Sequence, residues 1–379
     1  MRLGIDASNI IGRGGLTHLM HMMRIADPDK HGFKSISIWS SAPTLSKIGD
    51  RSWLIKRTDA ALEKALPFRV AWQRSQLHKQ LASEKCDVLF VPGGTCSSPF
   101  QPFITMCRNM IPFERHEMVR YGYSWQFLRN WLLRWSMTRT FRRADGLIFL
   151  TDFARQRVMQ TIGRVSGKAT TIPHGLDESF FSAPRNQSAV SSYSEVRPFR
   201  ILYVSLVDFY KHQWKVIEAI TNLREQGYPV SLELVGPAYE PALARMQQAI
   251  RSAGRHASSI SYPGPVAYKE LPRHYQQSDL FVFASSCENL PNTLLEAMAS
   301  GLPIACSNYG SMREVLGDAG LYFDPESAGE IKTAVKRFLD SPELRSRMAH
   351  QAYSRAHEFS WQNCADDTFT FLRSFSSTR

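Results

Sequence analysis

The sequence predicts an α/β protein made of two doubly wound domains, each with a parallel sheet. Short apolar runs typical of buried strands alternate with longer helix-compatible segments along the chain. This alternation stops once, at the serine-rich stretch 182–198, which has few large aliphatic residues and is typical of a linker. In addition, 379 residues exceed one ordinary core and suit two domains. We therefore expect domains at 1–181 and 199–355, joined by 182–198, with their sheets facing one cleft.

The expected strands follow one another in the order of the chain, and each is a short run of apolar or alternating residues. In the first half they are Leu3–Ala7, Ser35–Ser40, Val88–Val91, Phe103–Cys107, Leu147–Leu150 and Thr170–Pro173. In the second half they are Ile201–Leu206, Ser231–Val235, Ile260–Tyr262, Leu280–Ala284, Pro303–Cys306 and Leu321–Phe323. The tail 342–374 has a helical pattern with a break near Ser360.

The most informative stretch is FASSCENLPNTLLEAMASGLPIACS, which predicts a strand, a loop, a helix and a second strand. The strand is expected at 280–284, the loop at 285–291 and the helix at Thr293–Ser300, where Gly301 ends it. Ligands bind at the carboxyl ends of strands in an open parallel sheet, so this loop should line a binding crevice. The loop carries Glu288, and seven residues separate Glu288 from Glu296 on the helix.

This arrangement suits a nucleotide-sugar. Backbone N–H groups at the start of the helix, together with the helix dipole, favour a diphosphate. The two carboxylates of Glu288 and Glu296 could accept hydrogen bonds from sugar and ribose hydroxyls on either side of it. Two simpler interpretations stay open. Thr293 and Glu296 also fit a capping box, in which Glu296 only closes its own helix, and Glu288 could be a solvated loop residue.

With these residues the chain resembles the retaining GT-B glycosyltransferases of glycosyltransferase family 4, whose signature is a Glu-x7-Glu pair in this setting. The resemblance continues through EAMASGLPIACSNYGSMREVLGDAGLYFDP. The matching positions are Gly301, Pro303, Gly310, Glu314, Gly317, Asp318, Ala319, Gly320 and Pro325. The resemblance implies that Glu288 contacts the donor sugar and Glu296 the ribose, that no cofactor or metal is needed, and that a last helix within 356–379 returns to the first domain.

The start of the second domain, ILYVSLVDFYKHQ, supplies the expected cation. Lys211 matches a lysine that the family places here, and its charge would oppose the negative charge that develops on a departing diphosphate. The family's usual Gly-Arg is replaced by Ser205-Leu206, so we expect only a backbone contact from Ser205. A solvated surface lysine is the alternative. The full predicted donor set is Gly14, Gly15, Ser205, Lys211, Glu288, Asn289, Leu290, Pro291, Asn292, Thr293 and Glu296.

In the first half, a glycine-rich turn with Gly12, Gly14 and Gly15 follows the first strand and permits close approach by a phosphate or sugar. His18 lies one helical turn beyond it and is a candidate acceptor or donor contact, or else a packed histidine. Arg108-Asn109 occupies the place where many family members carry His-Asp. We expect Asn109 to contact a sugar and Arg108 an anion.

The segment Met118–Arg143 contains six arginines, no acidic residue and many aromatic ones. Trp131 and Trp135 fall on one helix face with Leu128 and Leu132 nearby, which suits the interface of an anionic membrane. The alternative is a helix whose apolar face covers its own sheet.

The formal net charge of +12 favours an acidic partner, such as a nucleotide donor or anionic lipid headgroups. Nucleic acid is not expected, since no zinc-finger spacing, RNP motif or helix-turn-helix is found. The six cysteines form no C-x-x-C pair, and no apolar run approaches the ~18 residues of a membrane span. The first residues enter a strand without a secretion-signal pattern. We expect a cytoplasmic protein, peripheral on the inner face of the cytoplasmic membrane if the arginine- and tryptophan-rich segment binds lipid.

Together these observations predict a retaining glycosyltransferase that moves a hexose from a GDP- or UDP-sugar to a glycan or lipid-linked acceptor, as in bacterial surface polysaccharide synthesis (lipopolysaccharide, O-antigen or capsule). Two alternatives remain. One is a different GT-B enzyme, such as a nucleotide-sugar epimerase or a phosphorylase. The other is a non-catalytic subunit that binds sugar or a membrane surface, because the family's arginine and His-Asp pair are missing.

Overall fold

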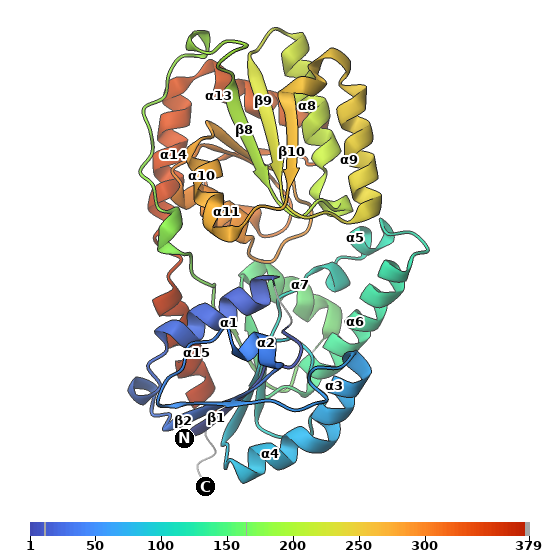
Figure 1. The fold of residues 1–379 in the computed structure, drawn as a ribbon, viewed down its shortest axis with the longest axis vertical. Coiled ribbons are helices and arrows are strands. Elements are labelled where there is room, and N and C mark those ends of the chain that lie inside the picture. Colours follow the sequence, from blue (N-terminus) through green and yellow to red (C-terminus); the bar gives the residue numbers. More distant parts are fainter. Residues whose placement is uncertain (11–12, 164, 376–379) are drawn as a thin grey trace. The chain divides into compact units, whose positions relative to one another are not determined.

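The computed structural model describes residues 1–10, 13–163 and 165–375, and the chain forms two compact units (Figure 1). The first unit comprises Met1–Phe113, Tyr123–Gly175 and the chain from Ser360 onward. The second comprises Glu114–Gly122 and Leu176–Phe359. Each unit has its own parallel sheet with a buried apolar core.

The described residues of the first unit contain a seven-stranded parallel sheet in the order β3-β2-β1-β4-β5-β6-β7. Its strands are β1 (Arg2–Asp6), β2 (Ser35–Trp39), β3 (Leu54–Arg57), β4 (Val88–Val91), β5 (Phe103–Met106), β6 (Gly146–Phe149) and β7 (Lys168–Thr171). The strand order reverses between β1 and β4, which makes the carboxyl ends of these strands the switch point of the sheet.

Strand β3 was not predicted from the sequence. This strand has the sequence Leu-Ile-Lys-Arg and pairs only with β2, at the edge of the sheet. Its residues are partly exposed, so it lacks the continuous apolar run of a central parallel strand. The expected strands all form, with ends that differ by one or two residues.

The helices of the first unit are α1 (Arg13–Ile25), α2 (Ala42–Leu45), α3 (Leu66–Trp72), α4 (His78–Ser83), α6 (Trp125–Arg143), α7 (Asp152–Ile162) and α15 (Trp361–Arg373). Although α15 ends the chain, it packs against α1 near its beginning (Figure 1). Ser360 caps α15 by accepting hydrogen bonds from the backbone N–H groups of Gln362 and Asn363.

The second unit has a six-stranded parallel sheet in the order β10-β9-β8-β11-β12-β13, all within the described residues. Its strands are β8 (Phe199–Val204), β9 (Val230–Val235), β10 (Ile260–Gly264), β11 (Leu280–Phe283), β12 (Ile304–Ser307) and β13 (Leu321–Phe323). Its helices are α5 (Arg115–Val119), α8 (Gln213–Glu225), α9 (Glu240–Ser252), α10 (Leu271–Gln276), α11 (Asn292–Ala299), α12 (Met312–Leu316), α13 (Ala328–Asp340) and α14 (Pro342–Ala356).

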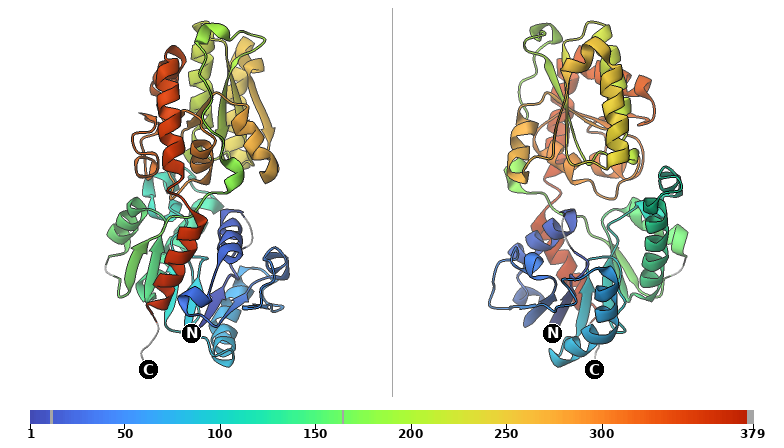
Figure 2. Two further views of the ribbon diagram at one scale, coloured as in Figure 1. Left: turned by 90° about the vertical axis from the view of Figure 1, so that its left-hand side faces the viewer. Right: turned by 45° about the vertical axis from the view of Figure 1, so that its right-hand side comes forward.

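These helices form two layers. Helix α8 packs against α9 and α13, whereas α11 packs against α10 and α14, and the sheet lies between the two groups (Figure 2). The order reverses between β8 and β11, so the switch point lies at the carboxyl ends of these two neighbouring strands.

The segment Glu114–Gly122 belongs to the second unit, whereas the sequence-based division assigned all of 1–181 to the first domain. The reason is a set of side-chain contacts. The Tyr121 hydroxyl donates to Asp208 Oδ1 over 3.0 Å, and its ring packs against Phe209 and Tyr239. Arg120 forms an ion pair with Glu326.

Candidate functional site

Except for Gly14 and Gly15, which belong to the first unit, the predicted donor residues lie in the second unit at and around the switch point of its sheet. Lys211 ends a 3-10 turn, Phe209–Lys211, that follows β8, and Glu288 lies in the loop between β11 and α11. Because β8 and β11 are hydrogen-bonded neighbours, their exit loops meet at the same edge of the sheet. Sequence spacing predicted each loop separately, and the sheet order brings them together.

Lys211 and Glu288 form an ion pair between Nζ and Oε1. The Lys211 side chain is 8% exposed and that of Glu288 15% exposed. The ammonium group also lies over the rings of Tyr210 and Phe283, with 5.1 and 5.0 Å from Nζ to the ring centroids. The alternatives of a solvated surface lysine and a solvated loop glutamate are therefore wrong. In this structure each residue neutralises the other's charge.

The surroundings hold this pair in place. The Tyr203 hydroxyl donates to the Lys211 carbonyl over 2.6 Å and so fixes the turn after β8. The next residue, His212, has a left-handed backbone with φ 49°, and its Nε2 lies 2.9 Å from Ser286 Oγ. Burial, and after it the charge of Arg120, lowers the pKa of His212 to about 4, so the ring is neutral at pH 7. His212 was not predicted as a site residue, and in the sequence only its position directly after Lys211 indicates such a role.

Glu296 is 3% exposed and lies in the middle of α11. Its Oε2 accepts a hydrogen bond of 2.8 Å from the Tyr275 hydroxyl. The capping-box interpretation is wrong, because Pro291 is the N-cap residue of α11 and no side chain caps the helix. The pKa of Glu296 is raised to about 7, chiefly by burial; the hydrogen bond from Tyr275 opposes this rise, and the charge of Asp177 adds to it. The carboxyl group therefore changes charge near neutral pH.

Asn289, Leu290, Pro291, Asn292 and Thr293 form the link from β11 into α11. The first three are buried, whereas Asn292 and Thr293 are partly exposed at the start of the helix. Backbone N–H groups in the first turn of a helix have no intrahelical acceptor, so this end can receive an anion.

Helix α11 ends at Ala299, as expected. Gly301 has φ +64°, and a Cβ there would lie 2.7 Å from the Ser182 carbonyl oxygen, which requires glycine at this position. Ser205 is buried at the end of β8, and its Oγ accepts a hydrogen bond of 2.9 Å from Gln213 Nε2. The Ser205 backbone N–H donates to the Val235 carbonyl over 2.9 Å, so the predicted backbone contact with the donor does not have this N–H group available.

The remaining predicted residues lie in the first unit, near the carboxyl ends of β1 and β5. Arg108 Nη2 donates to the Gly14 carbonyl, and a methyl group on Gly15 would lie 3.5 Å from Arg108 Nη1. His18, on α1, is 1% exposed. Asn109 Oδ1 accepts a hydrogen bond of 3.1 Å from the backbone N–H of Ile111, which gives it a local structural role. Gly12, the first glycine of the turn, lies outside the described residues.

Helix α6 presents an apolar stripe to solvent. Trp125, Trp131 and Trp135 are 72%, 53% and 61% exposed, and Leu128 and Leu132 lie between them at 44% and 45%. A different face of the helix, with Met137 and Phe141, is buried. The interpretation that this stripe covers its own sheet is therefore wrong. Among the described helices, none is long and apolar enough to cross a membrane.

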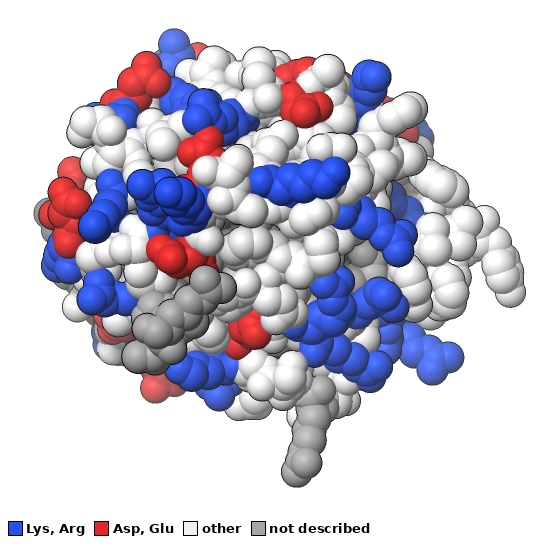
Figure 3. All heavy atoms as spheres, turned by 90° about the horizontal axis from the view of Figure 1, so that it is seen from below, with Lys and Arg blue, Asp and Glu red and all other residues white. Residues whose placement is uncertain are grey.

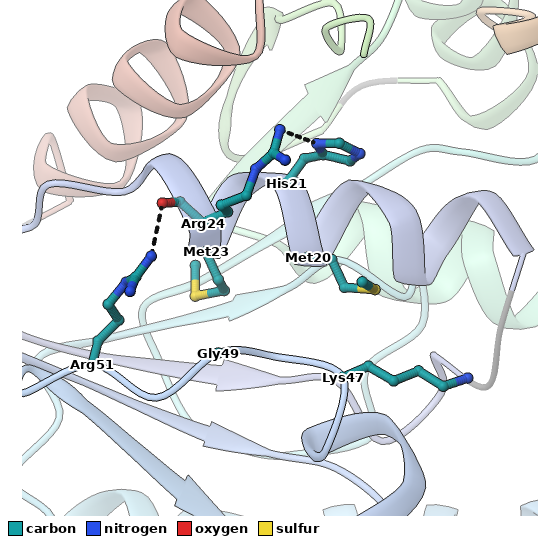
Figure 4. Close-up of a pocket in the computed structure, with 7 residues that line it drawn as sticks. All are labelled: Met20, His21, Met23, Arg24, Lys47, Gly49 and Arg51. Carbon is teal, nitrogen blue, oxygen red and sulfur yellow. Dashed lines mark hydrogen bonds between the residues drawn. The ribbon is translucent and has the colours of Figure 1, made fainter. Parts of the chain in front are cut away.

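A separate pocket of about 210 Å³ lies in the first unit between α1 and the loop 47–51 (Figure 4). Arg24, Lys47 and Arg51 line it, and all three are exposed. Arg24 Nη2 lies 3.1 Å from His21 Nδ1, and Arg51 donates to the Arg24 carbonyl over 3.4 Å. None of the predicted site residues lines this pocket.

Residues 186–355, which include every predicted donor residue of the second unit, match the family model described as glycosyl transferases group 1. The O-antigen chain mannosyltransferase B of Escherichia coli is 36% identical over 115 residues, which are 30% of each chain. The serotype-specific mannosyltransferase WbdA of Escherichia coli is 26% identical over 272 residues, 69% of this chain and 32% of that protein. The match thus spans about a third of the length of these curated relatives.

Solved structures share the fold of both units. Sucrose-phosphate synthase from Thermosynechococcus elongatus superposes with a TM-score of 0.76 at 15% identity, over 99% of this chain and 98% of that one. HepE of Anabaena in complex with UDP-glucose superposes with a TM-score of 0.69 at 15% identity, over 99% of this chain and 100% of that one. The predicted class, GT-B with two Rossmann-like doubly wound domains, is confirmed.

Proposed function

We propose that this protein is a retaining glycosyltransferase of family 4 that moves a hexose from a nucleoside-diphosphate sugar to a glycan or lipid-linked acceptor. The observation that carries the proposal is the Lys211–Glu288 pair beside the start of α11, at the switch point of the sheet in the segment that matches group 1 glycosyltransferases. The likeness to the O-antigen chain mannosyltransferase B of Escherichia coli favours a role in surface polysaccharide synthesis. HepE in complex with UDP-glucose favours a donor of this class.

The chemistry follows from charge. Breaking the bond between sugar and diphosphate places negative charge on the leaving phosphate, and Lys211 with the first amides of α11 would stabilise that charge. Glu288 would then release Lys211 and accept hydrogen bonds from the donor sugar. Glu296 would accept them from the ribose. The acceptor hydroxyl oxygen would bond to the anomeric carbon as the bond to the diphosphate breaks, and its proton would pass to the leaving phosphate. Retention at the anomeric carbon is what the resemblance implies, and no side chain acts as a covalent nucleophile in this proposal.

The test is a binding screen followed by turnover. Thermal shift with UDP, GDP, ADP and CMP should show one base that raises the melting temperature, because a ligand of the folded state stabilises it. With the matching sugar nucleotide, free nucleoside diphosphate should appear only when an acceptor is present, and NMR of the product should show the donor's anomeric configuration. Nucleotide binding without turnover would favour the non-catalytic subunit, and an altered sugar still attached to nucleotide would favour an epimerase.

We further propose that the α6 stripe binds an anionic membrane on the cytoplasmic side, where a lipid-linked acceptor would be held. The free energy of the exposed tryptophan side chains is lower at a lipid interface than in water. The arginines of the same helix can bind lipid phosphates. The charge of the protein fits this partner. Its net charge is +12, and Lys and Arg side chains gather on one side of the face in Figure 3.

Replacing Trp131 and Trp135 together by serine is expected to weaken binding to vesicles containing anionic lipid by at least about tenfold, because both rings lose their interfacial contact. Co-sedimentation at low and high salt measures it. Phe68→Ser is the matched control, since Phe68 is 55% exposed on α3 of the same unit and outside the stripe. Equal binding by wild type and the double variant would contradict the membrane assignment.

A further inference from the structure

Arg108 follows β5 and is a partly buried cation without an anionic partner in the described part of the chain. Its Nη2 donates to the Gly14 carbonyl, whereas Nη1 is fully buried and has no acceptor. No carboxylate of the described residues lies within ion-pair distance of it. Burial lowers the pKa of Arg108 to about 10, which still leaves the group charged at neutral pH.

Two more buried polar atoms, on His18 and on a residue that packs against it, have no hydrogen-bond partner among the described residues. His18 Nδ1 is one, and the other is Nε1 of Trp361, whose ring packs edge-on against His18 with centroids 5.5 Å apart. His18 Nε2 lies 3.7 Å from Cys364 Sγ. Burial is the main cause that lowers the pKa of His18 well below its usual value, and the charge of Arg108 is the second cause. The imidazole is therefore neutral and adds no second positive charge beside Arg108.

Such groups are rare in folded proteins because an unmade hydrogen bond at a buried polar atom costs free energy, and an unpaired buried charge costs more. Arg108 differs in this respect from the three cations that line the separate pocket, Arg24, Lys47 and Arg51. Those cations are exposed, so water solvates them and they require no ligand. Arg108 Nη1 differs because it is buried and meets neither solvent nor an acceptor in the described part of the chain, so its hydrogen-bonding capacity is unused.

We propose that Arg108 binds an anionic group, a phosphate or a carboxylate, carried by a substrate of the transfer reaction. The position fits this role, since Gly14 and Gly15 at the start of α1 place backbone and no side chain of their own beside the guanidinium. A guanidinium with free N–H groups binds such oxygens in a bidentate way. The proposal rests on the proposed function, and the group could come from the donor diphosphate or from an anionic acceptor.

The test compares wild type with Arg108→Gln and Gly15→Ala in buffer free of other multivalent anions. Gly15 lies within α1, so alanine there should be tolerated, and its methyl group would occupy the space beside Nη1. Calorimetric titration with inorganic phosphate and pyrophosphate should show binding to wild type that both variants weaken by about tenfold or more. Arg155→Gln, an exposed arginine of α7, is the control and should bind as wild type does.

Melting temperatures show whether a loss of binding comes from misfolding of a variant. Without anions, Arg108→Gln should melt no lower than wild type, because it removes an uncompensated charge, and added phosphate should raise the melting temperature of wild type only. Unchanged phosphate and pyrophosphate binding in both variants would overturn the proposal.

Two further measurements decide whether the donor or the acceptor carries the anionic group. If it is the donor, Arg108→Gln weakens binding of the nucleoside diphosphate found in the screen. If it is the acceptor, nucleoside diphosphate binds normally and KM for the acceptor rises instead. Normal transfer and normal KM values in Arg108→Gln would refute this inference alone, whereas absent nucleotide binding in wild type would refute the proposed function itself.

Discussion

Lys211→Met is expected to lower the rate of glycosyl transfer by about 10²–10³-fold, the typical loss when a preorganised charge that faces the developing anion is removed. Methionine keeps most of the buried stem of the side chain, so the change is mainly one of charge. The loss should fall on kcat more than on KM for the donor, because the phosphate charge grows as the bond breaks. Steady-state kinetics with saturating acceptor measures it.

The same substitution should also affect stability through Glu288. Removing either member of the pair leaves the other mostly buried and unpaired, which should lower the free energy of unfolding by about 2–4 kcal/mol. Removing both, in Lys211→Met with Glu288→Gln, should cost less than the sum of the single changes by about 2 kcal/mol. Urea unfolding of the four proteins gives this coupling energy.

Lys215 and Glu218 provide the matched control. They form an ion pair three residues apart on α8, and their side chains are 31% and 53% exposed. Exposed pairs couple by about 0–1 kcal/mol, so the same cycle should give a near-zero value here. Additive effects at Lys211 and Glu288, together with near-normal turnover in both single variants, would contradict the assignment of this pair.

The stability of wild type relative to Glu296→Gln is expected to fall as pH rises from about 4.5 to about 7. The folded pKa is raised, so in this window the folded state holds a proton that the unfolded state has released. Stability is therefore full below the ordinary pKa and is lost as the buried carboxyl ionises. The shift from 4.5 to about 7 corresponds to roughly 3 kcal/mol. Urea unfolding at several pH values checks the sign and the size.

Nucleotide binding should show the opposite trend. Ribose hydroxyls donate to an ionised carboxylate, so binding would require Glu296 to lose its proton. The Kd for the nucleoside diphosphate should therefore fall by about an order of magnitude between pH 6 and pH 8. The comparison is made against Glu296→Gln, because the phosphate group of the ligand also titrates in this range.

Tyr275→Phe gives an independent check. It removes the hydroxyl that donates to Glu296 and so should raise the carboxyl pKa further, which moves the binding transition to higher pH. Glu218→Gln, on the exposed side of α8, should change neither curve. A pH dependence in Glu296→Gln equal to that of wild type would show that Glu296 is not the titrating group.

Much of this protein follows from local sequence. Alternating strand and helix patterns with the break at 182–198 predicted two parallel-sheet domains, since the period of apolar residues reports which faces are buried. The loop carrying Glu288 and the helix ended by Gly301 were predicted for the same reason, together with turn chemistry. The exception is β3, an edge strand whose partly exposed polar residues give no apolar run.

What the sequence by itself determined was the set of elements and the residues at their ends. Only the tertiary structure decided which of those ends meet. Lys211 and Glu288 are far apart in the chain and touch because β8 and β11 are neighbours in the sheet. Tyr275 and His212 became part of the site, Glu296 became a buried acid instead of a helix cap, and Arg108 was left without a counter-charge. Burial and partners arise from contacts between distant segments, and these set the charge of each group.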